Sequence, residues 1–302
     1  MSITKLTAAG LAVAALGLSL SACGSDPTAG PKSATDTITV GSAAFPENEI
    51  VAEIYAQALE ADGVKVKKKL NIGAREAYIP ALKNGEIDLL PEYSGNLLAY
   101  LDKKASATSE ADIETALKSS LPSTLEVLTA SKAEDKDSLN VTSAFASKNG
   151  VATIADLAKV KGLKLGANPE FKTRPYGIPG LDKVYGIKDV KFTAISDGGG
   201  PATLKALLQG KVDVADIYST TPSIVANKLV TLEDPKNLIA AQNVLPLINS
   251  KKATAKVKAV LDKVSAQLTT EDLLDLNAKN QGADKTAPAT LAKQWLTDKG
   301  LL

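Results

Sequence analysis

The amino-acid sequence predicts an α/β protein built from two similar lobes. Three observations lead to this prediction: short apolar runs alternate with helical patterns, one stretch of sequence occurs twice, and the C-terminal part continues as helices. Strands that alternate with helices are typical of sheets whose strands run parallel. The length of 302 residues suits about two domains of ordinary size.

The composition narrows the classes of function. Lys and Arg total 35 and Asp and Glu total 34, so the chain has no basic excess with which to bind nucleic acid. Histidine is absent and cysteine occurs once, which removes the commonest general base, the commonest zinc ligands and any intramolecular disulfide. We therefore expect a binding protein rather than an enzyme, acting as a monomer, with no metal, no cofactor and no nucleic-acid partner.

Residues 1–22 have the pattern of a secretory signal. Lys5 carries the only charge, an apolar stretch follows over 6–22, and Leu-Ser-Ala stands directly before Cys23. This arrangement resembles the bacterial lipoprotein signal, which implies that Cys23 is lipidated; a plain secretory cleavage is the alternative. Residues 23–36, rich in Gly, Ser, Pro and Ala, are then a flexible tether. The expected location is the extracytoplasmic face of a bacterial cell membrane, held by the lipid anchor.

One segment of the sequence occurs twice. Residues 81–94 (ALKNGEIDLLPEYS) align without a gap on residues 206–219 (ALLQGKVDVADIYS), 125 positions later, and six of the 14 pairs are identical. The same offset places Gly41 on Gly166. We interpret the match as two copies of one unit, each with a helix, a Gly stop and a short buried strand. Two unrelated units with similar patterns are the alternative.

The individual strands and helices follow from these patterns. Predicted strands cover 37–41, 64–70, 87–90, 163–166, 190–195 and 212–215. Predicted helices cover 47–62, 181–185, 253–267, 270–280 and 288–298, and the glycine turn at 197–200 (DGGG) leads into another helix. Thr270 is expected to cap its helix, and Gly300 to end the last one.

Six loops are placed to form a ligand site, because ligands of open α/β sheets bind outside the carboxyl ends of the strands. These loops are 41–45, 73–76, 91–96, 166–174, 196–201 and 216–222, and they hold much of the Gly, Pro, Tyr and Ser of the chain. If the two lobes face each other, the loops line a cleft between them. Tyr93 and Tyr218, equivalent under the repeat, are then candidate walls of that cleft.

Other charged and aromatic residues are expected to have structural roles. The run Lys65–Lys69 (KVKKK) is predicted to be an edge strand with a solvent-facing side. Asp88 and Asp213 occupy equivalent places in the two copies, which favours structural roles over a pair of catalytic carboxylates. Arg75 is expected at a solvated helix start, with contact to an anionic ligand group as the alternative. Trp295 is expected in the core.

Four runs of the sequence together resemble one protein family. They are 39–47 (TVGSAAFPE), 81–96 with PEYSGN, 169–181 with PEFKTR and PGL, and 210–221 (GKVDVADIYSTT). Over residues 37–302 the chain resembles the glycine betaine/carnitine/choline-binding proteins of osmoprotectant ABC importers. The resemblance implies a two-lobed type II periplasmic-binding fold, with 37–140 and 243–302 in the first lobe and 141–242 in the second. It also implies that the lobes close on a ligand and deliver it to the transmembrane subunits of an ABC permease.

The resemblance also implies a ligand site. The family holds a quaternary ammonium in a box of aromatic rings and a carboxylate on basic and hydroxyl groups, which suits a cation that cannot donate a hydrogen bond. Transferred to this sequence, the implied ligand-binding residues are Ser42, Phe45, Tyr93, Asn96, Arg174, Tyr218 and Thr220. Among them, Tyr93 and Tyr218 correspond to box tyrosines and Arg174 to the arginine that binds the carboxylate.

Three positions depart from the family pattern. Ala43 stands where the first loop usually carries Lys, and two further box tyrosines fall near Leu139 and Leu204. A cation–π contact is worth about 0.5–2 kcal/mol, so the loss of two would weaken binding by roughly 5- to 1000-fold.

Two hypotheses about the identity of the ligand follow from these departures. Either glycine betaine binds weakly, or the ligand is another compound such as choline, carnitine, a betaine-like thione or an aromatic solute. The rings that could replace the missing ones are Phe45, Phe171, Tyr78 and Tyr176. A sensor domain without a transporter and a surface hydrolase in the same fold are the remaining alternatives.

Overall fold

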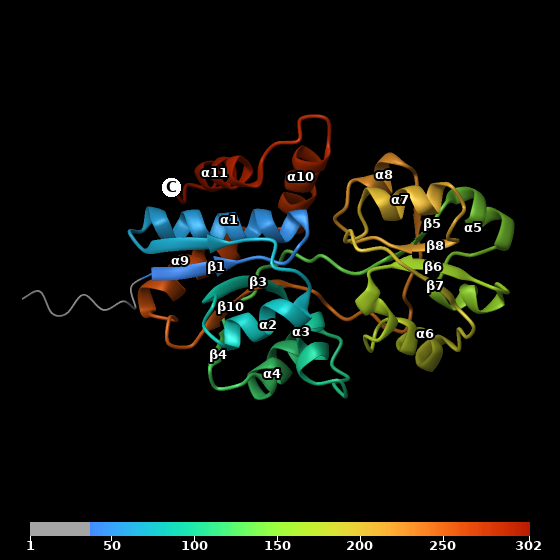
Figure 1. Ribbon diagram of the computed structural model, residues 1–302, viewed down its shortest axis with the longest axis horizontal. Helices are drawn as coiled ribbons and strands as arrows, with labels where there is room; N and C mark the ends of the chain where they lie inside the picture. Colours follow the sequence, from blue (N-terminus) through green and yellow to red (C-terminus); the bar gives the residue numbers. More distant parts are fainter. Residues whose placement is uncertain (1–36) are drawn as a thin grey trace, which may run out of the picture. The chain divides into compact units, whose positions relative to one another are not determined.

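The computed structural model describes residues 37–302, and in this part of the chain the strands form two five-stranded sheets (Figure 1). The predicted signal at 1–22, Cys23 and the tether at 23–36 lie outside the described residues. Within 37–302, the structure contains no helix that combines the length and the apolar character needed to cross a membrane.

The first sheet has the strand order β2-β1-β3-β10-β4. Its strands are β1 (Thr37–Gly41), β2 (Lys65–Lys69), β3 (Leu89–Tyr93), β4 (Leu125–Val127) and β10 (Val244–Asn249). β1 runs parallel to β2 and β3, whereas β10 runs antiparallel to β3 and β4. The lysine-rich β2 lies at the edge of the sheet with four of its five residues exposed, as predicted.

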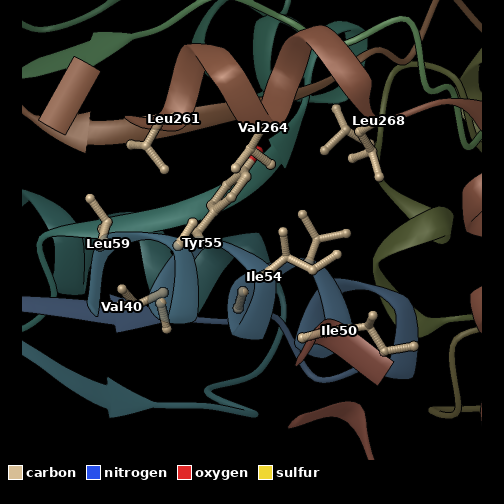
Figure 2. Close-up of a cluster of buried hydrophobic side chains, with 14 of the residues drawn as sticks. Val40, Ile50, Ile54, Tyr55, Leu59, Leu261, Val264 and Leu268 are labelled. Carbon is tan, nitrogen blue, oxygen red and sulfur yellow. The ribbon is translucent and has the colours of Figure 1, made fainter. Parts of the chain in front are cut away.

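Seven helices accompany the first sheet in the described part of the chain. They are α1 (Pro46–Ala61), α2 (Arg75–Lys83), α3 (Ser94–Leu101), α4 (Glu110–Ser120), α9 (Ala255–Gln267), α10 (Thr270–Gln281) and α11 (Pro288–Asp298). α1 packs against α9, α10 and α11, so the C-terminal helices return to the N-terminal part of the fold (Figure 1). Figure 2 shows part of this core, with apolar side chains of β1 and α1 facing Leu261, Val264 and Leu268 of the α9 region. Trp295 of α11 is buried in the same core, as predicted.

The second sheet has the strand order β7-β6-β8-β5-β9. Its strands are β5 (Leu139–Val141), β6 (Lys164–Ala167), β7 (Lys191–Ala194), β8 (Val214–Asp216) and β9 (Val230–Thr231). Its helices are α5 (Ser143–Asn149), α6 (Ile178–Tyr185), α7 (Pro201–Leu208) and α8 (Ser223–Ala226), with 3-10 helices at Ile154–Lys159 and Pro169–Lys172. A separate apolar core, which includes Leu165, Phe171, Leu181 and Val214, fills this part of the chain.

The two copies of the repeated segment make the same hydrogen bonds. The N–H of Asp88 donates to the carbonyl oxygen of Thr39 at 2.8 Å, and an Asp88 carboxylate oxygen accepts the N–H of Thr39 at 2.9 Å. Asp213 makes both bonds with Lys164, which stands 125 positions after Thr39, at the same two distances. Each aspartate therefore ties its own strand to the preceding parallel one, and the predicted structural roles of both are confirmed.

The topology of the sheets differs from the prediction. Both sheets are mixed rather than parallel, because β10 and β5 run antiparallel to their neighbours. Residues 91–96, predicted as a loop, form the end of β3 and the start of α3. The strand extends this far because Pro91 and Tyr93 lie opposite Pro246 and Val244 of β10.

The first residues of α10 and α7 show which side chains cap these two helices. Thr269, not Thr270, caps α10: its side-chain oxygen accepts the N–H of Asp272, whose carboxylate accepts the N–H of Thr269 in return. Only Thr269 stands three residues before an acidic side chain, and Thr270 instead accepts the N–H of Glu134 at 3.0 Å. The predicted glycine turn before α7 is confirmed, with the Asp197 carboxylate accepting N–H groups at the helix start.

Candidate ligand-binding site

A cavity of about 250 Å³ is lined by loops at the carboxyl ends of strands from both sheets. The loops after β1 and β2 and the junction of β3 with α3 contribute from the first sheet, and the loops after β6, β7 and β8 from the second. The lining residues are Ala43, Ala44, Phe45, Gly73, Ala74, Arg75, Tyr78, Tyr93, Asn96, Asp135, Asp137, Asn168, Pro169, Glu170, Arg174, Ser196, Gly198 and Tyr218. Five of the predicted ligand residues, Phe45, Tyr93, Asn96, Arg174 and Tyr218, are thus brought together around one space.

Three aromatic rings form one wall of the cavity. The ring centroid of Phe45 lies 5.8 Å from that of Tyr93 and 5.3 Å from that of Tyr218, with the second pair edge-to-face. The Tyr93 hydroxyl donates to Glu47 at 2.8 Å, and the Tyr218 hydroxyl accepts from the Asn168 amide at 3.0 Å. Because both hydroxyls are held, the rings keep a fixed orientation. Such a cluster can stabilise a cation through its ring faces.

Phe45 reaches this wall because of the local sequence around it. It is the residue before α1, whose first position is Pro46, and proline is preorganised for the first turn of a helix. The Asn48 side-chain oxygen accepts the N–H of Ala43 at 2.7 Å, and its amide donates to the carbonyl oxygen of Pro91 at 2.9 Å. The loop after β1 is therefore fastened to β3. Ala43, at the position where the family usually has Lys, lines the cavity without adding a charge.

Arg174 lines the cavity with its guanidinium already in use. It donates to the Tyr176 hydroxyl at 3.0 Å and to the carboxylate of Glu76 at 3.2 Å. Burial alone would lower the pKa of Arg174, but Tyr176, Asp137 and Glu76 together raise it, so the side chain stays charged. Toward Glu170, Arg174 donates only its backbone N–H, to the backbone carbonyl oxygen.

The position of Arg75 corrects the prediction of a solvated helix start. Its side chain is only 6% exposed, lines the cavity, and donates from Nε and Nη2 to the two carboxylate oxygens of Glu92 at 2.7 and 2.8 Å. Glu92 lies on β3, is fully buried, and also accepts from the Tyr78 hydroxyl. The prediction failed because Glu92 was placed in a loop, so no buried carboxylate was available to draw Arg75 inward.

Two acidic residues in the cavity were not predicted. Asp135 and Asp137 precede β5, and both line the cavity. Asp137 accepts from the Asn96 amide at 2.7 Å, and Asp135 accepts the N–H of Thr220 at 3.1 Å. Their only sequence signal is an alternating acidic pair, Asp-Lys-Asp, before the short alternating segment Ser-Leu-Asn-Val.

Four other predicted positions do not line the cavity. Ser42 is buried and accepts the N–H of Asn71 at 2.8 Å, and Thr220 is buried and donates to Glu47. Their roles as ligand contacts therefore stay predictions. The expectation that Leu139 and Leu204 mark lost cavity walls is wrong: Leu139 is a core residue of β5, and Leu204, a residue of α7, packs against a small apolar cluster. The residue that lines the cavity shortly before β5 is Asp137.

Burial raises the pKa of two carboxyl groups, Asp135 in the cavity lining and Asp216 next to it. Desolvation, followed by the charge of Glu47, raises the pKa of Asp135, and desolvation, followed by the charge of Asp137, raises the pKa of Asp216. Asp216 lies behind Asp137, is 2% exposed and has one carboxylate oxygen without a hydrogen-bond partner. A proton kept on Asp216 relieves this repulsion.

The raised pKa of Asp216 predicts that stability falls as pH rises. The folded protein binds this proton more tightly than the unfolded chain, so the stabilisation is complete below the ordinary carboxyl pKa of 3.8 and is lost as pH rises through the folded-state value. Asp216→Asn, which cannot ionise, is expected to raise the free energy of unfolding by about 1–3 kcal/mol at pH 8, and less at pH 4. Thermal unfolding across this range measures the difference.

Asp156→Asn is the control with the opposite sign. Hydrogen bonds from Lys159 and Thr153 lower the pKa of Asp156, so its contribution is present above the ordinary carboxyl pKa and is lost in acid. This variant is expected to lose stability at neutral pH. If Asp216→Asn showed the same pH profile as the wild type, the buried carboxyl would not titrate in the way proposed.

Known proteins of similar sequence agree with this description of the site. Residues 36–298 match the family described as the substrate-binding domain of ABC-type glycine betaine transport systems. The chain belongs to this family. Among curated relatives, the glycine betaine-binding protein YehZ of Escherichia coli is 29% identical over 286 residues, covering 89% of this chain and 93% of YehZ. The carnitine transport binding protein OpuCC of Listeria monocytogenes is 27% identical over 277 residues, covering 87% of each chain.

Solved structures show the same fold. A crystal structure of a glycine betaine/carnitine/choline ABC transporter protein superposes with a TM-score of 0.69 at 22% identity, over 87% of this chain and 99% of that one. Apo YehZ superposes with a TM-score of 0.62 at 27% identity, over 88% of this chain and 99% of that one. The predicted type II periplasmic-binding fold and the predicted family are confirmed. The chain is the substrate-binding part of an ABC transport system.

Proposed function

We propose that the chain captures a small quaternary amine or zwitterion in the cavity and delivers it to an ABC permease by closure of two lobes. The observation that carries the proposal is the wall of Phe45, Tyr93 and Tyr218, which stands in the same cavity as Arg174. Ring faces attract an ammonium that cannot donate hydrogen bonds, and a guanidinium suits a carboxylate. The relatives named for glycine betaine and carnitine support this ligand class. Binding without chemistry fits a chain that has no histidine.

The division into lobes and the attachment to the membrane are further parts of the proposal. We assign 37–140 and 243–302 to the first lobe and 141–242 to the second. The separate sheets and cores support two lobes, but β5 (Leu139–Val141) pairs in the second sheet, which moves the first boundary to just before Leu139. Lipidation of Cys23 would hold the protein at the extracytoplasmic face as a monomer. Metabolic labelling with palmitate tests the lipid anchor. If Cys23→Ser is still labelled, Cys23 is not the site of lipidation.

Calorimetric titration of residues 24–302, which contain both sheets and their cores, tests the proposed ligand class. Glycine betaine, carnitine and choline are the probes, and at least one is expected to bind at micromolar concentration or tighter. If none of the three compounds gives heat of binding at millimolar concentration, the proposed ligand class is wrong. Other solutes, or a sensor role, would then have to be tested.

Arg174→Ala is expected to weaken a ligand that carries a carboxylate by about 1.5–3 kcal/mol, the range for hydrogen bonds to charged groups. The affinity for choline, which has no carboxylate, should change far less. The paired titrations measure this difference in one experiment. An unchanged affinity for glycine betaine and carnitine would remove Arg174 from the ligand contacts.

A further inference from the structure

The walls of the cavity carry ionisable groups of both signs. Five such side chains line it: Arg75, Arg174, Asp135, Asp137 and Glu170. Each arginine already faces a carboxylate outside the lining, Glu92 for Arg75 and Glu76 for Arg174. Among residues 37–302, the ion pairs of the fold include neither Asp135 nor Asp137. Both arginines thus face a carboxylate of the protein. Burial and the charge of Glu47 raise the pKa of Asp135 and favour its neutral form, so Asp137, whose charge also acts on Arg174, is the aspartate available to a cation.

Asp137 is held in place to act on a ligand. One of its carboxylate oxygens accepts from Asn96 at 2.7 Å, and the Asn96 side-chain oxygen in turn accepts from the Gln242 amide at 2.7 Å. The side chain is 6% exposed, with the buried Asp216 behind it. The charge of Asp137 acts on Tyr218, a ring of the aromatic wall. A carboxylate and ring faces therefore meet at one side of the cavity, and both attract a cation.

We propose that Asp137 makes this cavity selective for a quaternary ammonium cation whose other end is uncharged, such as choline, over a zwitterion. The inference rests on the proposed function and narrows its ligand class. A cation gains from Asp137 and the rings at once. The carboxylate of a zwitterion would have to compete with Glu76 for Arg174 and would lie in the same cavity as Asp137, and like charges placed together cost affinity. Selectivity then comes from repulsion of the zwitterion as well as attraction of the cation.

The test compares three ligands of similar size by calorimetry on residues 24–302: choline, glycine betaine and the methyl ester of glycine betaine. The ester keeps the ammonium and removes only the negative charge. Choline and the ester are expected to bind at least about tenfold more tightly than glycine betaine. In Asp137→Asn, the affinity for choline should fall at least about tenfold while glycine betaine binds equally or more tightly. Asp182→Asn on the exposed side of α6 is the matched control and should alter neither affinity.

The possible outcomes separate the inference from the proposed function. If the wild type binds glycine betaine as tightly as choline and the ester, the inference is overturned and the proposed function stands. An equal loss for choline and glycine betaine in Asp137→Asn would likewise show that Asp137 does not discriminate. If none of the three ligands binds, the proposed function fails and the inference fails with it. If Asp137→Asn does not fold, the comparison of the ester with glycine betaine on the wild type decides the question.

Discussion

Replacing Arg75 with methionine is expected to lower the free energy of unfolding by about 3–5 kcal/mol, the cost of leaving a buried charge without its partner. The Arg75 side chain is 6% exposed and that of Glu92 is not exposed, and the two are joined by a bidentate pair at 2.7 and 2.8 Å. Methionine fills a similar space but leaves the Glu92 carboxylate in the core with only the Tyr78 hydroxyl and the Tyr93 N–H as donors. Denaturant unfolding monitored by circular dichroism measures the loss.

Two further variants show that the loss comes from the unpaired charge. Arg75→Met combined with Glu92→Gln should recover most of the stability, because glutamine keeps an acceptor for the two remaining donors and carries no charge. Lys69→Met breaks the exposed pair with Glu86 and should cost less than about 1 kcal/mol. A similar loss in the single and double variants would mean that the packing of Arg75, rather than its charge, stabilises the fold.

Much of the fold could be predicted because local signals agree with it. Helix α11 follows the predicted range 288–298, and β1 follows 37–41, since both have clear patterns and clear ends. The repeat predicted two equivalent units, and the matching hydrogen bonds of Asp88 and Asp213 show that the two segments are also equivalent in structure. The strand β10 was missed although residues 244–248 are an apolar run, because Pro246 inside the run argues against a strand that is paired on both sides. Its place depends on pairing with β3, some 150 residues earlier in the chain.

The candidate site was predicted less completely than the fold. Tyr93, Tyr218 and Arg174 were chosen by family resemblance and by their position at strand ends, and all three line the cavity. Asp137 was missed because the family ring was placed two residues later, at Leu139, on a residue of the core. Which residue of a loop faces a cavity depends on the register of the strand that follows, and sequence patterns fix that register poorly in a strand of three residues.

Replacing Glu47 with leucine is expected to weaken ligand binding by about 100-fold, or about 3 kcal/mol. Glu47 lies in the first turn of α1, is 3% exposed, and accepts from Tyr93 at 2.8 Å, from Asn277 at 2.6 Å and from the Thr220 hydroxyl. These partners come from the first sheet, from α10 and from the loop after β8 of the second sheet. Leucine leaves the hydroxyls of Tyr93 and Thr220 without this acceptor, whereas Asn277 still donates to Thr220. A buried donor without an acceptor costs about 1–3 kcal/mol. This loss destabilises the conformation in which the cavity is fully formed and Tyr93 is held in its orientation, which is the conformation that binds the ligand.

A graded series of variants separates this effect from a general loss of stability. Glu47→Gln keeps an acceptor oxygen, so its affinity should lie between those of the wild type and Glu47→Leu. Glu60→Leu makes the same change at the exposed end of α1 and should leave affinity unchanged. Titration with the ligand that the wild type binds most tightly, at a temperature where each variant is folded, gives the comparison. Affinity within about threefold of the wild type in Glu47→Leu would contradict the argument, since a threefold change is worth less than one hydrogen bond to a charged group.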